Sequence, residues 1–204
     1  MVRVPPGRSG RLWLIRRRAA GEHAADLLDR KLRILRSEHG RLRQQANRAA
    51  AEWRAACRRA DTWGLRAALT GGQRALRLAA AEPAVVEFGW EQLMGTRYPG
   101  TASIVDGATP AIGCPGGAAL VEAAAAYRTA LRAAASHAAA DAALRVVTAE
   151  IDATRRRLRA ITEQWLPRLD TALRERNRQL AEAELAETAR LRWATRPARR
   201  DRIH

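Results

Sequence analysis

The residues that could bind a metal or act as nucleophiles are few and isolated in this sequence. The two cysteines, Cys57 and Cys114, are far apart and form no C-x-x-C pair, which is typical of a reducing compartment. The histidines share no spacing that would bring two of them to one metal ion; they are His23, His39, His137 and His204. The sequence therefore predicts no metal centre and no disulfide framework.

Phosphate-binding chemistry is not indicated either. Two glycine-rich pieces, at 71–72 and 113–117, lack the G-K-[ST] sequence with which a phosphate-binding loop continues. We therefore expect no nucleotide site, no cofactor and no catalytic residue in the chain.

The arginine residues offer the other candidate chemistry, which is the binding of an acidic partner. The formal net charge is +16, and all but one of the 37 basic residues are arginine, the exception being Lys31. Runs of arginine stand at 16–18, at 155–157 and within 196–202. One interpretation is that some of them face acidic loops of a partner. The other is a solvated helix surface enriched by the codon usage of a GC-rich genome.

The composition indicates long helices that pack over a narrow seam. Only nine of the 204 residues are aromatic, and the 47% hydrophobic share is carried mostly by alanine. Arginine interrupts every apolar run near the start, so no signal peptide is predicted. No apolar stretch reaches the ~18 residues of a membrane span, so we expect a cytoplasmic chain that meets a membrane only indirectly.

The first long segment carries a heptad pattern from Leu28 to Ala67. Apolar or small residues recur there in steps of four and three. They are Leu28, Leu32, Leu35, His39, Leu42, Ala46, Ala49, Trp53, Ala56, Ala60, Trp63 and Ala67. Upstream, Leu12, Ile15 and Ala19 predict an out-of-phase continuation with a slip near Gly21. The glycines at 71–72 are expected to end the helix or to interrupt it before an extension to about residue 81.

The middle of the chain has a different composition and no helical pattern. Between 83 and 117, proline and glycine separate short β-prone pieces at 85–88 and 101–105, which predicts a short hairpin with loops. The helical pattern resumes near Ala118. Its heptad positions are Leu144, Val147, Ile151, Thr154, Leu158, Ile161 and Trp165, and Leu169, Leu173, Leu180 and Leu191 continue with imperfect phase.

These segments predict an all-α fold: a long antiparallel two-helix coiled coil whose N- and C-terminal helices are joined by a short tip with a β-hairpin. The expected divisions are 1–82, 83–117 and 118–204, the last including a basic tail. At ~1.5 Å per residue, each helix would be on the order of 90 to 110 Å long. Both chain ends would then lie together.

Pro167 interrupts the second heptad pattern. Proline removes one backbone donor and clashes with the carbonyl of Glu163, which bends or ends a helix. A kink inside one continuous helix is favoured over a helix end, because Leu169 and Leu173 continue the apolar face.

The tryptophans divide between the seam and other positions. Trp53 and Trp63 are expected in the seam, with a partner pocket as the alternative. Trp13, Trp90 and Trp193 lie off the pattern, and one of them is a candidate anchor for a neighbouring protein.

Three segments resemble, in order, signatures of the D subunit of the V-type and A-type rotary ATPases. Residues 156–170, RRLRAITEQWLPRLD, resemble the family's R-R-V-N-A-L-E-x-x-x-I-P-R-L-E in its C-terminal helix. Residues 27–31, LLDRK, resemble its L-L-K-x-K-R motif behind a similar opening at 6–9. Residues 93–99, LMGTRYP, resemble its V-M-G-V-x-x-P segment, and 182–192 resemble its E-x-E-R-E…R-L-K ending.

Some positions depart from the family pattern. Gly7 stands in place of Thr, residues 32–34 replace R-D-E, and Arg159 and Thr162 replace Asn and Glu. Polar contacts made by those family residues are therefore not expected here.

The resemblance implies a non-catalytic central rotor stalk that couples ATP synthesis or hydrolysis to proton or sodium transport. Implied partners are the nucleotide-binding A and B subunits, the small F subunit of the stalk and the ring-docking subunit of the C/d type. The complex would lie at the cytoplasmic face of the plasma membrane of a high-GC prokaryote. Candidate partner contacts are Met94, Gly95, Pro99, Arg155, Arg156 and Arg157.

Two other classes of function fit a basic coiled coil. A nucleic-acid binder would use the positive charge to neutralise phosphates, but the sequence has no basic zipper and no aromatic stacking surface. A homo-oligomeric or membrane-surface scaffold would need no insert between the helices. The rotor stalk is the favoured prediction, without a nucleic-acid partner.

Overall fold

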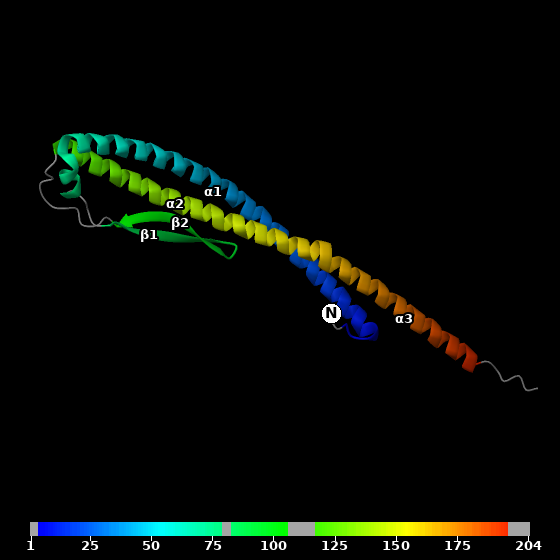
Figure 1. The fold of residues 1–204 in the computed structure, drawn as a ribbon. Coiled ribbons are helices and arrows are strands. Elements are labelled where there is room, and N and C mark those ends of the chain that lie inside the picture. The colour runs from blue at the N-terminus through cyan, green and yellow to red at the C-terminus, as the bar shows by residue number, and fades with distance from the viewer. Residues whose placement is uncertain (1–3, 79–82, 106–116, 196–204) are drawn as a thin grey trace, which may run out of the picture. The chain divides into compact units, whose positions relative to one another are not determined.

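The computed structural model describes residues 4–78, 83–105 and 117–195, and Cys114 and the arginines at 196–202 lie outside these ranges. Figure 1 shows the elements in chain order. They are α1 (Gly7–Leu78), β1 (Val85–Leu93), β2 (Thr96–Val105), α2 (Gly117–Arg159), the π-helical segment η1 (Ala160–Trp165) and α3 (Leu166–Ala194). The expected fold class is confirmed: two long helical segments pack antiparallel, with a short β-hairpin between them in the sequence.

The chain divides into two compact units. The central unit comprises 31–154, and the terminal unit combines 1–30 with 155–204. Helices α1 and α2 each contribute residues to both units.

Alanine dominates the seam of the central unit. Ala46 and Ala49 pack with Ala140, and farther along α1 Ala60 packs with Ala126 and Ala130. Buried alanines leave little side-chain volume between two helices, so the backbones approach closely while each contact contributes little transfer free energy. Larger side chains, among them Leu32, Leu35, Leu42 and Val147, are buried to 2% exposure or less and supply the larger hydrophobic contributions.

Helix α1 is interrupted near its C-terminal end. Gly72 has φ 68° and ψ 174°, which is not helical, and helix resumes up to Leu78. Only glycine adopts this conformation without strain. Of the two alternatives for the glycines at 71–72, the structure therefore has the interruption followed by a short extension.

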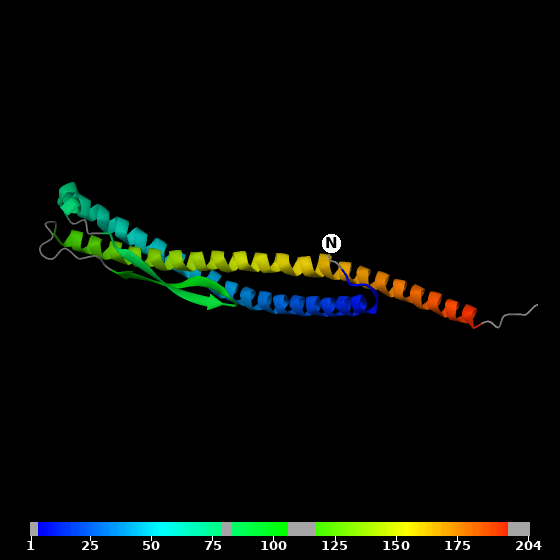
Figure 2. The same cartoon turned by 90° about the horizontal axis from the view of Figure 1, so that it is seen from below.

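The hairpin is a two-stranded antiparallel sheet in the central unit (Figure 2). Val85 pairs with Val105 and Leu93 with Thr96, and a bulge opposite Gly89 and Trp90 leaves Gly100 as the extra residue. Met94 and Gly95 form the two-residue turn, and both have positive φ, 50° and 81°, as a type I′ turn requires.

The hairpin lies against the side of α1. Tyr98 and Pro99 are buried, and the Tyr98 hydroxyl lies 3.1 Å from Glu38 of α1, far along that helix from its end at Leu78. Burial of the aromatic ring favours this position over one in which the hairpin projects into solvent.

The terminal unit is a second antiparallel helix pair. Arg8 bonds Glu184 and Arg18 bonds Asp170, so positions that ascend in α1 meet positions that descend in α3. Its buried residues in α1 include Leu14, Gly21 and Ala25, and Leu169 is buried in α3.

The expected slip near Gly21 is wrong. Leu14, Gly21 and Ala25 fall in the same 3-4 register as Leu28 and Leu32, whereas Leu12 is 53% exposed, Ile15 is 39% exposed and Ala19 is also exposed. The hydrophobic pattern predicted the wrong phase because Gly21 and Arg18, which are not hydrophobic, occupy seam positions. Helix α1 is thus in phase throughout this region.

The irregularity lies in the opposite helix. Residues 160–165 are π-helical, and the backbone is right-handed helical at Arg159 before the segment and at Leu166 after it. The second helix therefore does not end at Pro167, which is the second residue of α3.

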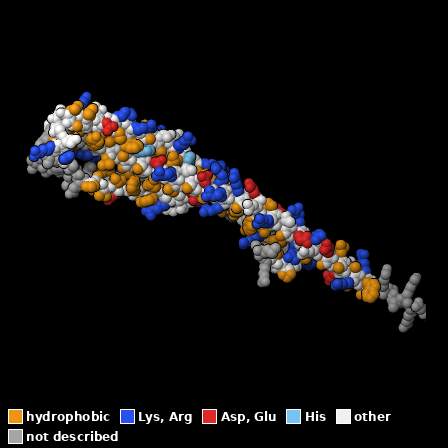
Figure 3. Space-filling model, in the orientation of Figure 1, with side chains coloured by type: hydrophobic (Ala, Val, Ile, Leu, Met, Phe, Trp, Pro, Cys, Tyr) orange, Lys and Arg blue, Asp and Glu red, His pale blue; other side chains and the backbone are white. Residues whose placement is uncertain are grey.

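The surface carries arginine along both units. Figure 3 shows Lys and Arg side chains spread over the visible face, with hydrophobic atoms gathered in several areas between them. Among the residues that the structure describes, no helix combines the length and the apolar character needed to traverse a bilayer.

Candidate functional site

The histidine and cysteine residues that the structure describes do not come together. Within 4–78, 83–105 and 117–195, no three of the His, Cys, Asp and Glu side chains are grouped as metal ligands would be. His137 stacks on Trp53 with ring centroids 5.2 Å apart, and its buried Nδ1 has no hydrogen-bond partner. Cys57 is a half-buried free thiol. These groups pack as parts of the helical seam.

The heptad residues named from the sequence differ in exposure. Leu32, Leu35, Leu42, Val147 and Ile151 are buried at 7% exposure or less. The half-buried ones are Leu28, Trp63, Leu144, Leu158, Ile161 and Trp165. Trp53 is 36% exposed and reaches the seam through its stack on His137.

One ion pair lies inside the seam of the central unit. The Lys31 Nζ donates to Glu150 Oε1 at 2.7 Å, and both side chains are about four-fifths buried, at 21% and 22% exposure. Thr154, fully buried one turn farther along α2, donates to the same carboxylate oxygen at 3.3 Å. A largely buried charge pair in a mostly apolar seam tolerates one alignment of the two helices, so it favours a single register.

A polar cluster fastens the hairpin to α1. The buried hydroxyl of Tyr98 lies 3.1 Å from Glu38 and 3.2 Å from Glu91, and Arg41 forms a bidentate pair with Glu38. Burial, together with the two carboxylates, raises the pKa of Tyr98 to about 12. The hydrogen bond from Arg41 lowers the pKa of Glu38.

Gly100 makes the hairpin side of this cluster possible. A Cβ at that position would lie 2.3 Å from Oε1 of Glu91, so the bulge residue leaves the space that the carboxylate occupies. The cluster was not predicted from the sequence, because its four side chains come from positions 38, 41, 91 and 98.

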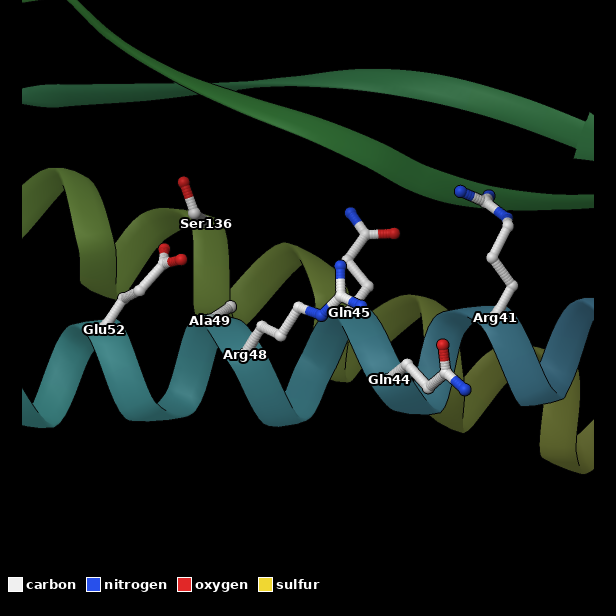
Figure 4. A pocket seen from close by; sticks show the side chains of 7 residues that line it. All are labelled: Arg41, Gln44, Gln45, Arg48, Ala49, Glu52 and Ser136. Atoms are coloured by element: carbon white, nitrogen blue, oxygen red, sulfur yellow. The ribbon is translucent and has the colours of Figure 1, made fainter.

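A polar groove lies beside the cluster and is lined by residues of α1 and by Ser136 of α2 (Figure 4). Its cavity volume is about 490 Å³. In Figure 4, Arg41, Gln45 and Ser136 point toward the strand that passes over the groove. Arg48 and Glu52 give the wall charges of both signs. The mixed polar walls fit water or a polar side chain better than an apolar ligand.

The hairpin residues proposed as partner contacts are not equally accessible. Met94 at the turn is 44% exposed and Gly95 is exposed beside it, whereas Pro99 is buried. A partner could therefore reach Met94 and Gly95 more readily than Pro99 in this conformation, and the contact role of all three stays a prediction. Trp90, 55% exposed, presents its ring with Arg97 stacked 4.7 Å from the ring centroid.

The arginine run at 155–157 lies at the end of α2. Arg155 is half-buried, and Arg156 and Arg157 are exposed. In the run at 16–18, Arg18 pairs with Asp170 at 2.7 Å and with Glu22 at 2.9 Å. These contacts, the hydrogen bond to Asp170 foremost, raise the pKa of Arg18. Part of the arginine content thus serves the helix pair itself.

Trp165 meets α1 at Gly21. A Cβ on Gly21 would lie 2.4 Å from a carbon of the indole ring, so only glycine admits the ring here. Arg17 stacks between two tryptophans, with its guanidinium 5.4 Å from the Trp165 centroid and 5.7 Å from that of Trp13. The contact holds one side of η1 against α1.

Comparison with known proteins agrees with this architecture. The family model for the D subunit of ATP synthase matches residues 13–196, which is most of the chain. A comparison of the chain with curated proteins found no match. A match that includes the seam helices, the hairpin and the η1 region identifies the chain as a member of the ATP synthase D-subunit family, the non-catalytic stalk component of V/A-type rotary ATPases.

Proposed function

We propose that the chain is the central rotor stalk of a V/A-type ATPase or ATP synthase. In this role it transmits rotation between ATP chemistry in the catalytic hexamer and proton or sodium transport in the membrane. The match to the D-subunit family over residues 13–196 is the observation that carries the proposal.

The helical seam suits an element that must transmit torque. Alanine contacts such as Ala49 with Ala140 bring the helices close together, and short side chains leave little room for shear. The largely buried pair of Lys31 and Glu150 opposes sliding, because a slip would separate the ammonium group from the carboxylate.

The proposed partners are those of the family's complexes: the A and B subunits of the hexamer, the small F subunit of the stalk, and a ring-docking subunit of the C/d type. The chain would lie in the cytoplasm at the plasma membrane, held there through the complex. Met94 and the arginines at 155–157 are the proposed contact residues. Each arginine contact would be weak, as rotation past successive subunits requires.

Purification of the complex tests the assignment. A tagged chain purified from its own cells should bring down the nucleotide-binding subunits and the F subunit in fixed ratio, with ATPase activity. Recovery of the chain alone, or with nucleic acid that salt removes steeply, would contradict the rotor assignment.

The arginine contacts need a separate test. Arg155, Arg156 and Arg157 are replaced together by alanine, and ATP hydrolysis and ion transport are measured in the reconstituted complex. We expect transport per ATP to fall. The control replaces three exposed arginines of α1, at 54, 58 and 59, which removes the same charge from another surface. Equal coupling in the two triple variants would refute a specific role for 155–157 and leave the rotor assignment standing.

A further inference from the structure

The C-terminal helix contains one residue more than the regular 3-4 spacing of seam positions accommodates. A strict 3-4 alternation would continue from Leu158 and Ile161 to positions 165, 168, 172, 175 and 179. Positions 168, 175 and 179 are instead exposed and carry Arg, Glu and Gln. Most of the buried or half-buried side chains stand one position later, at Leu169, Leu173, Arg176 and Leu180, whereas half-buried Ala172 keeps a regular position.

The segment η1 lies where this offset arises. The N–H of Leu166 donates to the carbonyl of Ile161, five residues earlier, whereas an α-helix would use the residue four earlier. A π-turn of this kind holds one additional residue without breaking the helix. The facing residues of α1, from Leu14 through Gly21 to Leu32, keep the regular register. The extra residue thus belongs to the C-terminal helix alone.

Pro167 restricts where the π-turn can stand. If the turn moved toward the N-terminus, Leu166 would bond in the α pattern and the proline ring would lie in an α-helix against the carbonyl of Glu163, where it clashes. In the observed position, Pro167 follows the π-turn directly. On the opposite side, the ring of Trp165 fits the space above Gly21.

We propose that η1 is a register device of the terminal unit. One extra residue creates the π-turn, which turns Leu169, Leu173 and Leu180 toward α1, and Pro167 pins the turn beside Gly21. The extra residue, rather than the proline, is the cause of the π-turn. The inference concerns the chain itself and does not depend on the partner that the chain binds.

Single-residue deletions test the device. Deleting exposed Thr162 together with Pro167→Ala should convert η1 to α-helix and leave the later residues in place. The matched control deletes Thr171, which is also an exposed threonine but lies in regular helix. Its loss turns everything beyond it by about 100°.

The register is read by cross-linking the full-length chain. Arg8 and Glu184, which pair in the structure, are both replaced by cysteine in a variant without the native cysteines and joined by a short bis-maleimide. The yield in the Thr162-deleted Pro167→Ala chain should stay within about twofold of the parent, and in the Thr171-deleted chain it should fall about tenfold, given the ~100° turn. A loss of cross-link or of folding in the first chain as large as in the second would overturn the proposal.

The variant Pro167→Ala alone separates the two possible causes. With the extra residue still present, the cross-link should form, while hydrogen exchange across 160–170 becomes faster because the π-turn is no longer pinned. If the proline were the cause, the helix would become α-helical, the later residues would turn, and the cross-link would be lost. That result, or unchanged exchange, would contradict the device as proposed.

Discussion

Replacing Gly21 with alanine is expected to destabilise the chain, although alanine is the better helix former. An exposed Gly→Ala change inside a helix gains about 1 kcal/mol. At position 21 the added methyl would lie 2.4 Å and 2.9 Å from two ring carbons of Trp165 and 3.0 Å from Leu166. Overpacking of this kind costs about 1 to 3 kcal/mol, and more where a rigid ring must move. Because the indole ring is rigid, the upper part of this range, about 2 to 3 kcal/mol, applies. After subtraction of the helix gain of about 1 kcal/mol, we expect a net loss of about 1 to 2 kcal/mol.

Gly40 is the control within the same helix. A Cβ there meets nothing within 4 Å, so Gly40→Ala should stabilise the chain by about 1 kcal/mol. For a protein of this size that corresponds to a rise in Tm of roughly 2 to 4 °C, measured by circular dichroism, and Gly21→Ala should lower Tm.

A double-mutant cycle isolates the contact with the ring. In a Trp165→Ala chain the obstacle is gone, so Gly21→Ala should become stabilising, with a coupling free energy of roughly 2 to 3 kcal/mol between the two sites. If Gly21→Ala raises Tm in the parent as Gly40→Ala does, the packing of the indole ring on Gly21 is wrong.

Three further perturbations follow from the seam and the hairpin. Because the pKa of Tyr98 is raised to about 12, its contribution to stability is complete below the ordinary value near 10 and is lost as the pH rises toward 12. Hydrogen exchange of the hairpin should show this loss, and Tyr98→Phe should abolish it; equal pH dependence in both chains would exclude Tyr98 as the titrating group. Lys31→Met removes the ammonium partner of the Glu150 carboxylate and should cost about 2 kcal/mol in urea unfolding. The double variant Lys31→Met, Glu150→Gln should recover most of this loss; no recovery would argue against the pair. Leu35→Ala, at a fully buried position, should cost about 2 to 5 kcal/mol, and the neighbouring Ile34→Ala, 43% exposed, much less; equal losses would contradict the assigned seam.

The sequence predicted the architecture wherever the seam consists of large apolar residues. Leu32, Leu35 and Leu42 repeat at the heptad spacing and are buried. Upstream, the seam passes through Arg18 and Gly21, which no hydrophobic pattern reveals, and the neighbouring Leu12 and Ile15 suggested another phase.

The extra residue in the second helix did leave a trace in the sequence. The steps from Ile161 through Trp165 and Leu169 to Leu173 are all of four residues, where a regular seam would alternate four and three. Such a run shows that the phase changes but does not show whether the helix bends, ends or widens. The packing of Trp165 on Gly21, beside which the π-turn lies, is a contact between distant parts of the chain.

The hairpin was predicted from its β-prone pieces, but its position was not. The Tyr98 hydroxyl reaches Glu38 across 60 positions of sequence, and no local pattern encodes that contact. The turn at Met94 and Gly95 also departs from the Asn-Gly sequence that signals a type I′ turn most clearly.

The pairing of Lys31 with Glu150 has a practical consequence for mapping any assembly that contains this chain. Lys31 is its single lysine, and the ammonium group is occupied by a carboxylate within a half-buried seam. Reagents that react with primary amines will therefore modify almost no side chain along the helices. The absence of cross-links from this chain in a lysine-directed cross-linking map then carries no information about its neighbours. Carboxylate- or arginine-directed probes, for which the surface offers many targets, are the chemistry that can report where it lies.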